Sequence, residues 1–146
     1  MSIFNSFDIS ASGMTAQRFR TDIIMQNIAN ATTTRTEDGT PYRRRIVTFE
    51  EKENTPFSNV LARTSADVVG NGVKVTRVSE DYETEMVKSY DPSHPDADED
   101  GYVTYPNVNI ITEMTNMIDA SRAYEANATA FEASKSIVTK GLSLGK

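Results

Sequence analysis

Six residues about two thirds of the way along the chain have the spacing of the first half of a calcium-binding loop. The run from Asp96 to Gly101 reads D-A-D-E-D-G, and in such loops oxygens at alternate positions surround the ion while glycine permits a sharp turn. The second half does not match, because the twelfth position is Asn107, which cannot supply a bidentate carboxylate. The pattern favours a solvated acidic turn. A small calcium-binding or adaptor module that uses Asp96 to Asp100, with helices as a target-binding groove, is the alternative.

The single histidine, His94, is the only imidazole available for a catalytic triad or a metal site. It lies between Ser93 and Pro95 without an evident nucleophile and base, which favours a turn residue hydrogen-bonded to the backbone. The run from Gly70 to Gly72 lacks the remaining residues of a phosphate-binding loop. We therefore expect no enzyme activity, no cofactor, no metal and no small-molecule substrate.

Composition narrows the class of protein further. The 146 residues allow one small domain, and a hydrophobic fraction of 38% without tryptophan gives a thin core. A net charge of −6, with Arg43 to Arg45 as the only basic run, argues against nucleic-acid binding. The absence of cysteine excludes disulfides and thiolate sites.

Neither a membrane span nor a cleavable secretion signal is expected. No apolar run approaches the roughly 18 residues that a membrane helix needs. The first residues lack the basic start and apolar centre of a secretion signal. From composition alone, the protein would be cytosolic.

The last forty residues predict a long amphipathic helix from about Pro106 to Gly141, with Asn107 or Asn109 as its cap and Gly141 as its end. Its mainly apolar residues form one stripe along the helix, and burying that stripe requires another helix beside it. Steps of three and four residues along it give Ile110, Met114, Met117, Ser121, Tyr124, Ala128, Phe131, Lys135, Val138 and Leu142.

A second amphipathic helix is predicted from about Asp8 to Asn30, where β-branched threonines end it. Apolar residues such as Phe7, Met14 and Ile28 share one stripe. The two end helices would pair antiparallel. The expected fold class is therefore mainly α, with paired, coiled-coil-like terminal helices flanking a small antiparallel β insert.

The insert is expected to have three or four short strands. Strands are predicted from Tyr42 to Glu50, with Val47 and Phe49 on one face, from Val73 to Val78 and from Met86 to Tyr90. Turns are expected at 38–41 and 70–72, and a loop at 51–58. At least one guanidinium of Arg43 to Arg45 should face the helices or a neighbour, which makes this run a candidate for ion pairs with the acidic residues; a solvated strand face is the alternative.

An acidic loop from Asp91 to Gly101 follows. It is expected to continue through Tyr102 to Pro106 into the last helix. Its prolines fix two φ angles, and tyrosines lie near its ends, so it is stiffer than a linker needs to be. We therefore consider it a candidate contact with a neighbouring subunit, made by Pro92, His94, Pro95, Tyr102 and Tyr105.

Several runs resemble the bacterial flagellar axial proteins, which form the rod, the hook and the hook-filament junction. The run N-I-A-N-A-T-T from Asn27 to Thr33 resembles the N-terminal signature shared by that family. The runs 38–44, 90–98, 105–109 and 120–127 resemble the basal-body rod members. The last of these runs is common to the axial family, whereas D-P-S-H-P from Asp91 to Pro95 is the specific one. The resemblance covers the length of the chain.

This resemblance implies a structural subunit of the proximal rod, which transmits torque across the cell envelope and surrounds the export channel. It also implies export by the flagellar type III apparatus without a cleaved signal peptide. The expected partners are copies of the chain, other rod proteins, the export apparatus and the motor-ring base.

In this interpretation residues 1–34 and 107–146 form the helical assembly core, and residues 35–106 form the β-rich insert with its acidic loop. The expected assembly interface combines the signature with the stripe of the last helix. Its candidate residues are Asn27, Ile28, Asn30, Ile110, Met114, Met117, Tyr124, Ala128, Phe131, Val138 and Leu142.

Overall fold

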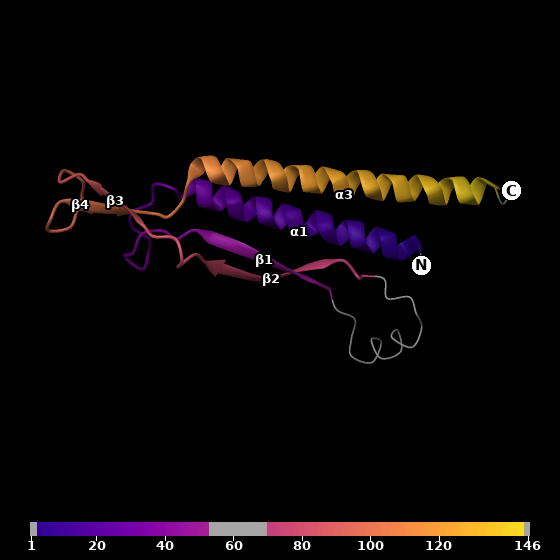
Figure 1. The fold of residues 1–146 in the computed structure, drawn as a ribbon, viewed down its shortest axis with the longest axis horizontal. Coiled ribbons are helices and arrows are strands. Elements are labelled where there is room, and N and C mark those ends of the chain that lie inside the picture. Colours follow the sequence, from indigo (N-terminus) through magenta and orange to yellow (C-terminus); the bar gives the residue numbers. More distant parts are fainter. Residues whose placement is uncertain (1–2, 53–69, 145–146) are drawn as a thin grey trace, which may run out of the picture. The chain divides into compact units, whose positions relative to one another are not determined.

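The computed structural model describes residues 3–52 and 70–144, so the predicted loop at 51–58 falls mostly outside the described residues. The mainly helical fold class with a small β region is confirmed (Figure 1). The elements are α1 (Ile3–Ala29), β1 (Arg45–Glu51), β2 (Val73–Glu80), β3 (Val87–Tyr90), β4 (Tyr102–Tyr105) and α3 (Ile110–Leu144).

The chain forms two compact units, to both of which the two helices contribute. The first unit comprises Met1–Phe19, Thr48–Arg77 and Ala120–Lys146. The second comprises Arg20–Val47 and Val78–Asp119.

In the first unit, α1 and α3 run antiparallel. The rings of Phe7 and Phe131 lie 4.9 Å apart between centroids. Further along α1, Gly13 lies against Asn127. The residue numbers therefore increase along α1 while those of its contacts on α3 decrease. Strand β2 is fastened to α1 because the amide of Val73 donates to Ser12 Oγ at 3.0 Å.

In the second unit, the core is small and contains many polar groups. Its buried apolar side chains include Ile23, Ile24, Tyr42 and Val103. Asn27, Asp81, Asn107 and Glu113 are buried as well. Buried polar groups need hydrogen-bond partners, so polar contacts must hold this unit together as much as apolar packing does.

The strands pair as two separate two-stranded sheets, β1 with β2 and β3 with β4. The amide of Asp81 donates to Arg44 O, and that of Lys52 donates to Gly72 O, which shows that β1 and β2 are antiparallel. The predicted faces of β1 are confirmed, since Val47 and Phe49 are half-buried.

Strand β4 corrects the sequence prediction, which placed a loop at its position. Tyr102 to Tyr105 is too short for a clear alternating pattern, and it becomes a strand because it pairs with β3. The register joins Val87 to Tyr105 and Tyr90 to Tyr102. The turn between the two strands includes Gly101, whose φ of 78° suits a residue without Cβ.

The helix ends differ from the predicted ones. Helix α3 begins at Ile110 rather than near Pro106, because Asn109 caps it through bonds from Ile111 and Thr112 to its Oδ1. The alternative cap, Asn107, is buried and bonded elsewhere.

Gly141 does not end α3, which continues to Leu144. This glycine is not among those with positive φ, so it makes no left-handed cap. At the other end of the chain, α1 begins at Ile3, ahead of the predicted Asp8.

The stripe of α3 that lies against α1 coincides with the predicted stripe only in part. Met117, Ala128, Phe131 and Val138 agree with it because they are half-buried, whereas Tyr124 is 42% exposed. Between them, small or polar residues one position earlier make the contact: Glu113 is 1% exposed, whereas Met114 is 50% exposed. Two helices approach closely only where side chains are small or hydrogen-bonded, a condition that apolar periodicity does not detect.

Candidate functional site

A polar network in the second unit joins the end of α1 to the start of β1. Asn27 Nδ2 donates to Arg45 O at 2.9 Å and to Glu113 Oε2 at 3.0 Å. Asn27 Oδ1 accepts from the Arg45 amide and from the Tyr42 hydroxyl, both at 2.9 Å. The amide thus uses all four of its hydrogen-bonding positions, which fixes its orientation.

Glu113 is the second member of this network and receives two cationic hydrogen bonds. Arg44 donates to its Oε1 from Nε at 3.0 Å and from Nη2 at 2.8 Å. The Nη1 of Arg44 also reaches Asp81 Oδ2 at 3.4 Å. The prediction that one of the three arginines faces a helix and makes ion pairs is confirmed for Arg44.

Asp81 closes the network at the end of β2. Its Oδ1 accepts from the amides of Glu83 and Thr84 at 3.0 Å, and its Oδ2 accepts from the Thr84 hydroxyl at 2.8 Å. These bonds, led by that from the Thr84 amide and with a smaller contribution from Arg44, hold the pKa of the Asp81 carboxyl below its usual value. Asn107 Nδ2 donates to the carbonyls of Asp81 and Thr84, which anchors the chain before α3.

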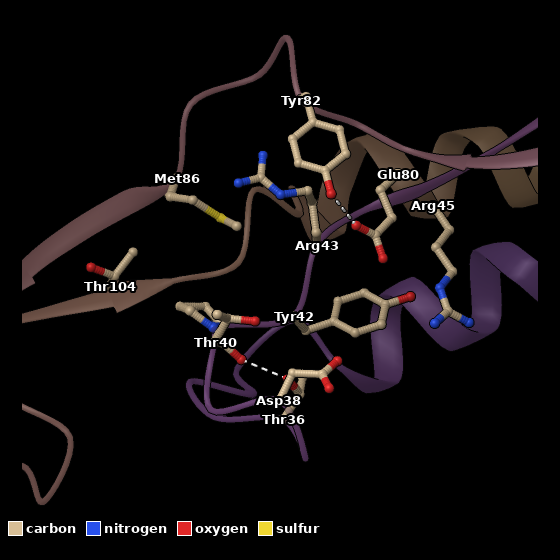
Figure 2. Close-up of a pocket in the computed structure, with 11 residues that line it drawn as sticks. Thr36, Asp38, Thr40, Tyr42, Arg43, Arg45, Glu80, Tyr82, Met86 and Thr104 are labelled. Atoms are coloured by element: carbon tan, nitrogen blue, oxygen red, sulfur yellow. Dashed lines mark hydrogen bonds between the residues drawn. The ribbon is translucent and has the colours of Figure 1, made fainter.

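A surface pocket of about 570 Å³ lies beside this network, also in the second unit. In Figure 2 the Arg43 side chain lies beside Tyr82, with its guanidinium carbon 4.2 Å from the ring centroid. The Tyr82 hydroxyl donates to Glu80 Oε2 at 2.7 Å. The lining residues are Thr36, Asp38, Thr40, Pro41, Tyr42, Arg43, Arg45, Glu80, Tyr82, Met86 and Thr104.

Tyr42 joins the pocket to the network. Its ring lies 5.8 Å from the Arg45 guanidinium, and its hydroxyl bonds to Asn27. Burial is the main reason why the pKa of this hydroxyl is raised, so it stays protonated and able to donate.

Two aspartates of the half-matched calcium loop, Asp96 and Asp98, have hydrogen-bond or ion-pair partners within the chain. Asp96 Oδ2 accepts from Thr34 Oγ1 at 2.8 Å, and its Oδ1 lies 3.7 Å from Arg35 Nη1. Asp98 Oδ1 accepts from the amides of Asp100 and Tyr102. Within residues 3–52 and 70–144, no three histidine, cysteine or acidic side chains are arranged to hold a metal ion. The calcium-binding alternative is therefore not supported.

His94 is a turn residue, as the sequence indicated. Its Nδ1 accepts from the Asp96 amide at 3.1 Å, and its ring meets that of Tyr105 edge-on at 6.4 Å. Of the other residues in the candidate inter-subunit loop, Pro92 and Pro95 are exposed, Tyr102 is 44% exposed, and Tyr105 is half-buried.

The candidate interface residues occupy different environments. Asn27 is 1% exposed and faces inward, so we assign it to the internal network. Its neighbours Ile28 and Asn30 are half-buried, as is Ala128. The more exposed stripe residues are Ile110, Met114, Tyr124 and Leu142.

Sequence reasoning missed the network that contains Asn27, Asn107 and Glu113. One signal was present, because Asn27 follows Ala16 and Ile23 at helical spacing and is thus a polar residue on an apolar stripe. Its partners come from segments far away in the sequence, so no local pattern could identify them.

In the described parts of the chain, neither helix is long and apolar enough to cross a membrane.

Comparison with known proteins gives matches over the whole chain. Residues 99–144 match the family described as "Flagellar basal body rod FlgEFG protein C-terminal". The flagellar basal-body rod protein FlgC of Borreliella burgdorferi is 43% identical over 150 residues, covering 99% of this chain and 98% of that protein. FlgC of Bacillus subtilis is 41% identical over 152 residues, and FlgC of Salmonella typhimurium is 37% identical over 146 residues; both alignments cover 100% of each chain.

Proposed function

The chain belongs to the FlgC family of flagellar basal-body rod proteins and is a structural subunit of the rod, and we propose that it builds the proximal part. There it transmits torque across the cell envelope and surrounds the export channel. Its neighbours are copies of itself and other rod proteins, with the motor-ring base beneath and the type III export apparatus as its route. We assign it no catalytic role.

The observation that carries this proposal is the amount of apolar surface that α3 leaves uncovered. Ile111 is 78% exposed, Ile137 is 67% exposed, and Leu142 and Leu144 are 71% and 88% exposed. Exposed large apolar side chains that recur along one helix favour contacts with other chains. Removing apolar surface from water yields about 25 cal/mol per Å², so neighbouring subunits would stabilise this helix.

In this proposal the terminal segments 1–34 and 107–146 form the assembly core, and the insert 35–106 lies outside it. Ile110, Met114, Tyr124 and Leu142 extend the α1-facing stripe sideways and would contact neighbouring helices. The loop with Pro92, Pro95 and Tyr102 would make a second contact.

The test places a charge on the exposed apolar surface of α3. We expect Ile137→Asp to abolish rod completion and swimming, because a carboxylate would be buried in each repeated contact. Thr139→Asp, an exposed polar position on the same helix, is the matched control. The measurements are electron microscopy of isolated basal bodies and swimming in soft agar, with circular dichroism of both purified variants.

Complete rods and normal swimming with Ile137→Asp would contradict the proposal that this surface is buried in the rod. Equal loss with Thr139→Asp would do so as well, because the effect would then follow from charge on α3 and not from apolar contact.

A further inference from the structure

The pocket of Figure 2 carries the guanidinium groups of Arg43 and Arg45, and neither makes an ion pair with a carboxylate of the described residues. Arg43 donates from Nη1 to the backbone carbonyl of Asp81 at 3.1 Å, and Arg45 contacts the ring of Tyr42. Among the described residues, the ion pairs of arginine within 4.0 Å involve Arg35 and Arg44, not these two. The pocket therefore combines arginine and tyrosine, two residue types enriched at the centres of protein interfaces.

The turn between β3 and β4 carries negative charge, which is complementary to the two arginines of the pocket. Glu99 and Asp100 are exposed, and no ion pair of either carboxylate occurs among the described residues. Tyr90 and Tyr102 lie beside each other at the base of this turn, with ring centroids 5.3 Å apart, and are 65% and 44% exposed. Acidic and aromatic groups are thus presented together.

The turn is stiff, which makes it a suitable inserting element. Asp98 Oδ1 accepts from the Tyr102 amide at 2.7 Å, and the Asp98 amide donates to Tyr102 O at 2.9 Å. A preformed turn loses little conformational entropy when it binds.

We propose that the turn Glu99–Asp100 of one copy of this chain docks in the pocket with Arg43 and Arg45 of the next copy. This partner deepens the proposed function and rests on it. The occupant is a second copy because the complementary charges belong to one chain and, among its described residues, form no ion pairs. Carboxylates would bind the two guanidinium groups, and the tyrosines would contact Tyr82 and Met86.

Such a contact is head-to-tail, because the two surfaces differ. A head-to-tail contact that does not close into a ring generates an open helical assembly, as a rod requires. Asp38 and Glu80 also line the pocket and oppose an incoming carboxylate, so a single contact between free subunits should be weak. Repetition along the polymer compensates for this weakness.

The first experiment is a charge exchange in a flagellated cell that has only the variant chain. Arg45→Asp and Asp100→Arg should each lower the number of complete rods by about fivefold, as expected for loss of an exposed ion pair. The double variant should return to within about twofold of wild type, because the pair is restored with opposite sign. Arg77→Asp and Glu37→Arg change exposed charges outside the pocket and the turn and are the controls.

The second experiment uses the absence of cysteine in the chain. Thr40→Cys in the pocket and Glu99→Cys in the turn are combined in one chain, which keeps both arginines and Asp100. A short cysteine-specific cross-linker should give a ladder of dimers and higher species in isolated basal bodies, whereas each single variant should give none.

The outcomes separate this inference from the proposed function. Variant chain that is present in complete rods but gives no ladder, or a double variant no better than the single ones, overturns the docking proposal alone. Wild-type chain missing from isolated basal bodies overturns the proposed function itself.

Discussion

Gly13 of α1 lies directly against the side chain of Asn127 in α3. A Cβ at position 13 would come within 2.6 Å of Asn127 Oδ1 and 2.9 Å of its Cγ. The amide cannot turn away freely, because its Nδ2 donates to Ala123 O at 2.7 Å. This glycine therefore permits the close approach of the two helices in the first unit.

We expect Gly13→Ala to lower the free energy of unfolding by about 1 kcal/mol, since overpacking outweighs the gain in helix propensity. Gly141→Ala is the control, because Gly141 also lies inside α3 but has nothing within 4 Å. That change should stabilise the chain by up to about 1 kcal/mol. Urea unfolding measures both values, and the same sign for both variants would contradict the close-approach explanation.

The Asn27 network predicts a large effect from an apolar side chain of similar size. Asn27→Leu leaves the Tyr42 hydroxyl and the Arg45 amide and carbonyl without their partner and removes one partner of Glu113. We expect a loss of about 3 kcal/mol in the free energy of unfolding. Gln26→Leu, at an exposed position of the same helix, should change it by less than about 0.5 kcal/mol. Similar midpoints for both variants in urea would show that the network contributes little.

Asp81 predicts a defined response to acid. Its folded-state pKa is lower than the ordinary 3.8, so the carboxylate stabilises the fold above that value and loses this contribution as pH falls below it. Wild type should therefore lose more stability than Asp81→Asn between about pH 4 and pH 2. Asp22→Asn, which removes an exposed carboxyl, controls for the change of one charge. Thermal unfolding measured across this pH range tests the prediction. Parallel plots of melting temperature against pH for wild type and Asp81→Asn would refute the stabilising role of the Asp81 carboxylate.

The acidic loop predicts an effect on assembly that exceeds its effect on the fold. Replacing both Pro92 and Pro95 with glycine increases the freedom of an exposed segment, so binding would have to order it. We expect rod completion to fall several-fold while the urea midpoint of the purified chain shifts little. Counting rods by electron microscopy gives the first quantity. If the midpoint falls as much as the assembly does, the loop is only internal structure.

The sequence alone determined the elements that depend on local pattern. Apolar spacing identified both long helices, threonines after Asn30 marked the end of α1, and alternation placed Val47 and Phe49 on one face of β1. The run of arginines also indicated an ion pair with the helices, which Arg44 makes with Glu113. These features depend on residues that are close together in the sequence, so the sequence alone is enough to predict them.

The tertiary structure decided what depends on partners far away in the sequence. Strand β4 exists because β3 pairs with it, and Asn27 and Glu113 are buried because each completes the hydrogen bonds of the other. The α1-facing stripe of α3 passes through Asn127 because Gly13 leaves room for it. Sequence periodicity identifies the apolar positions of a helix. Close contact between two helices instead requires small side chains and polar groups with hydrogen-bond partners. Only the folded chain shows which positions meet these requirements.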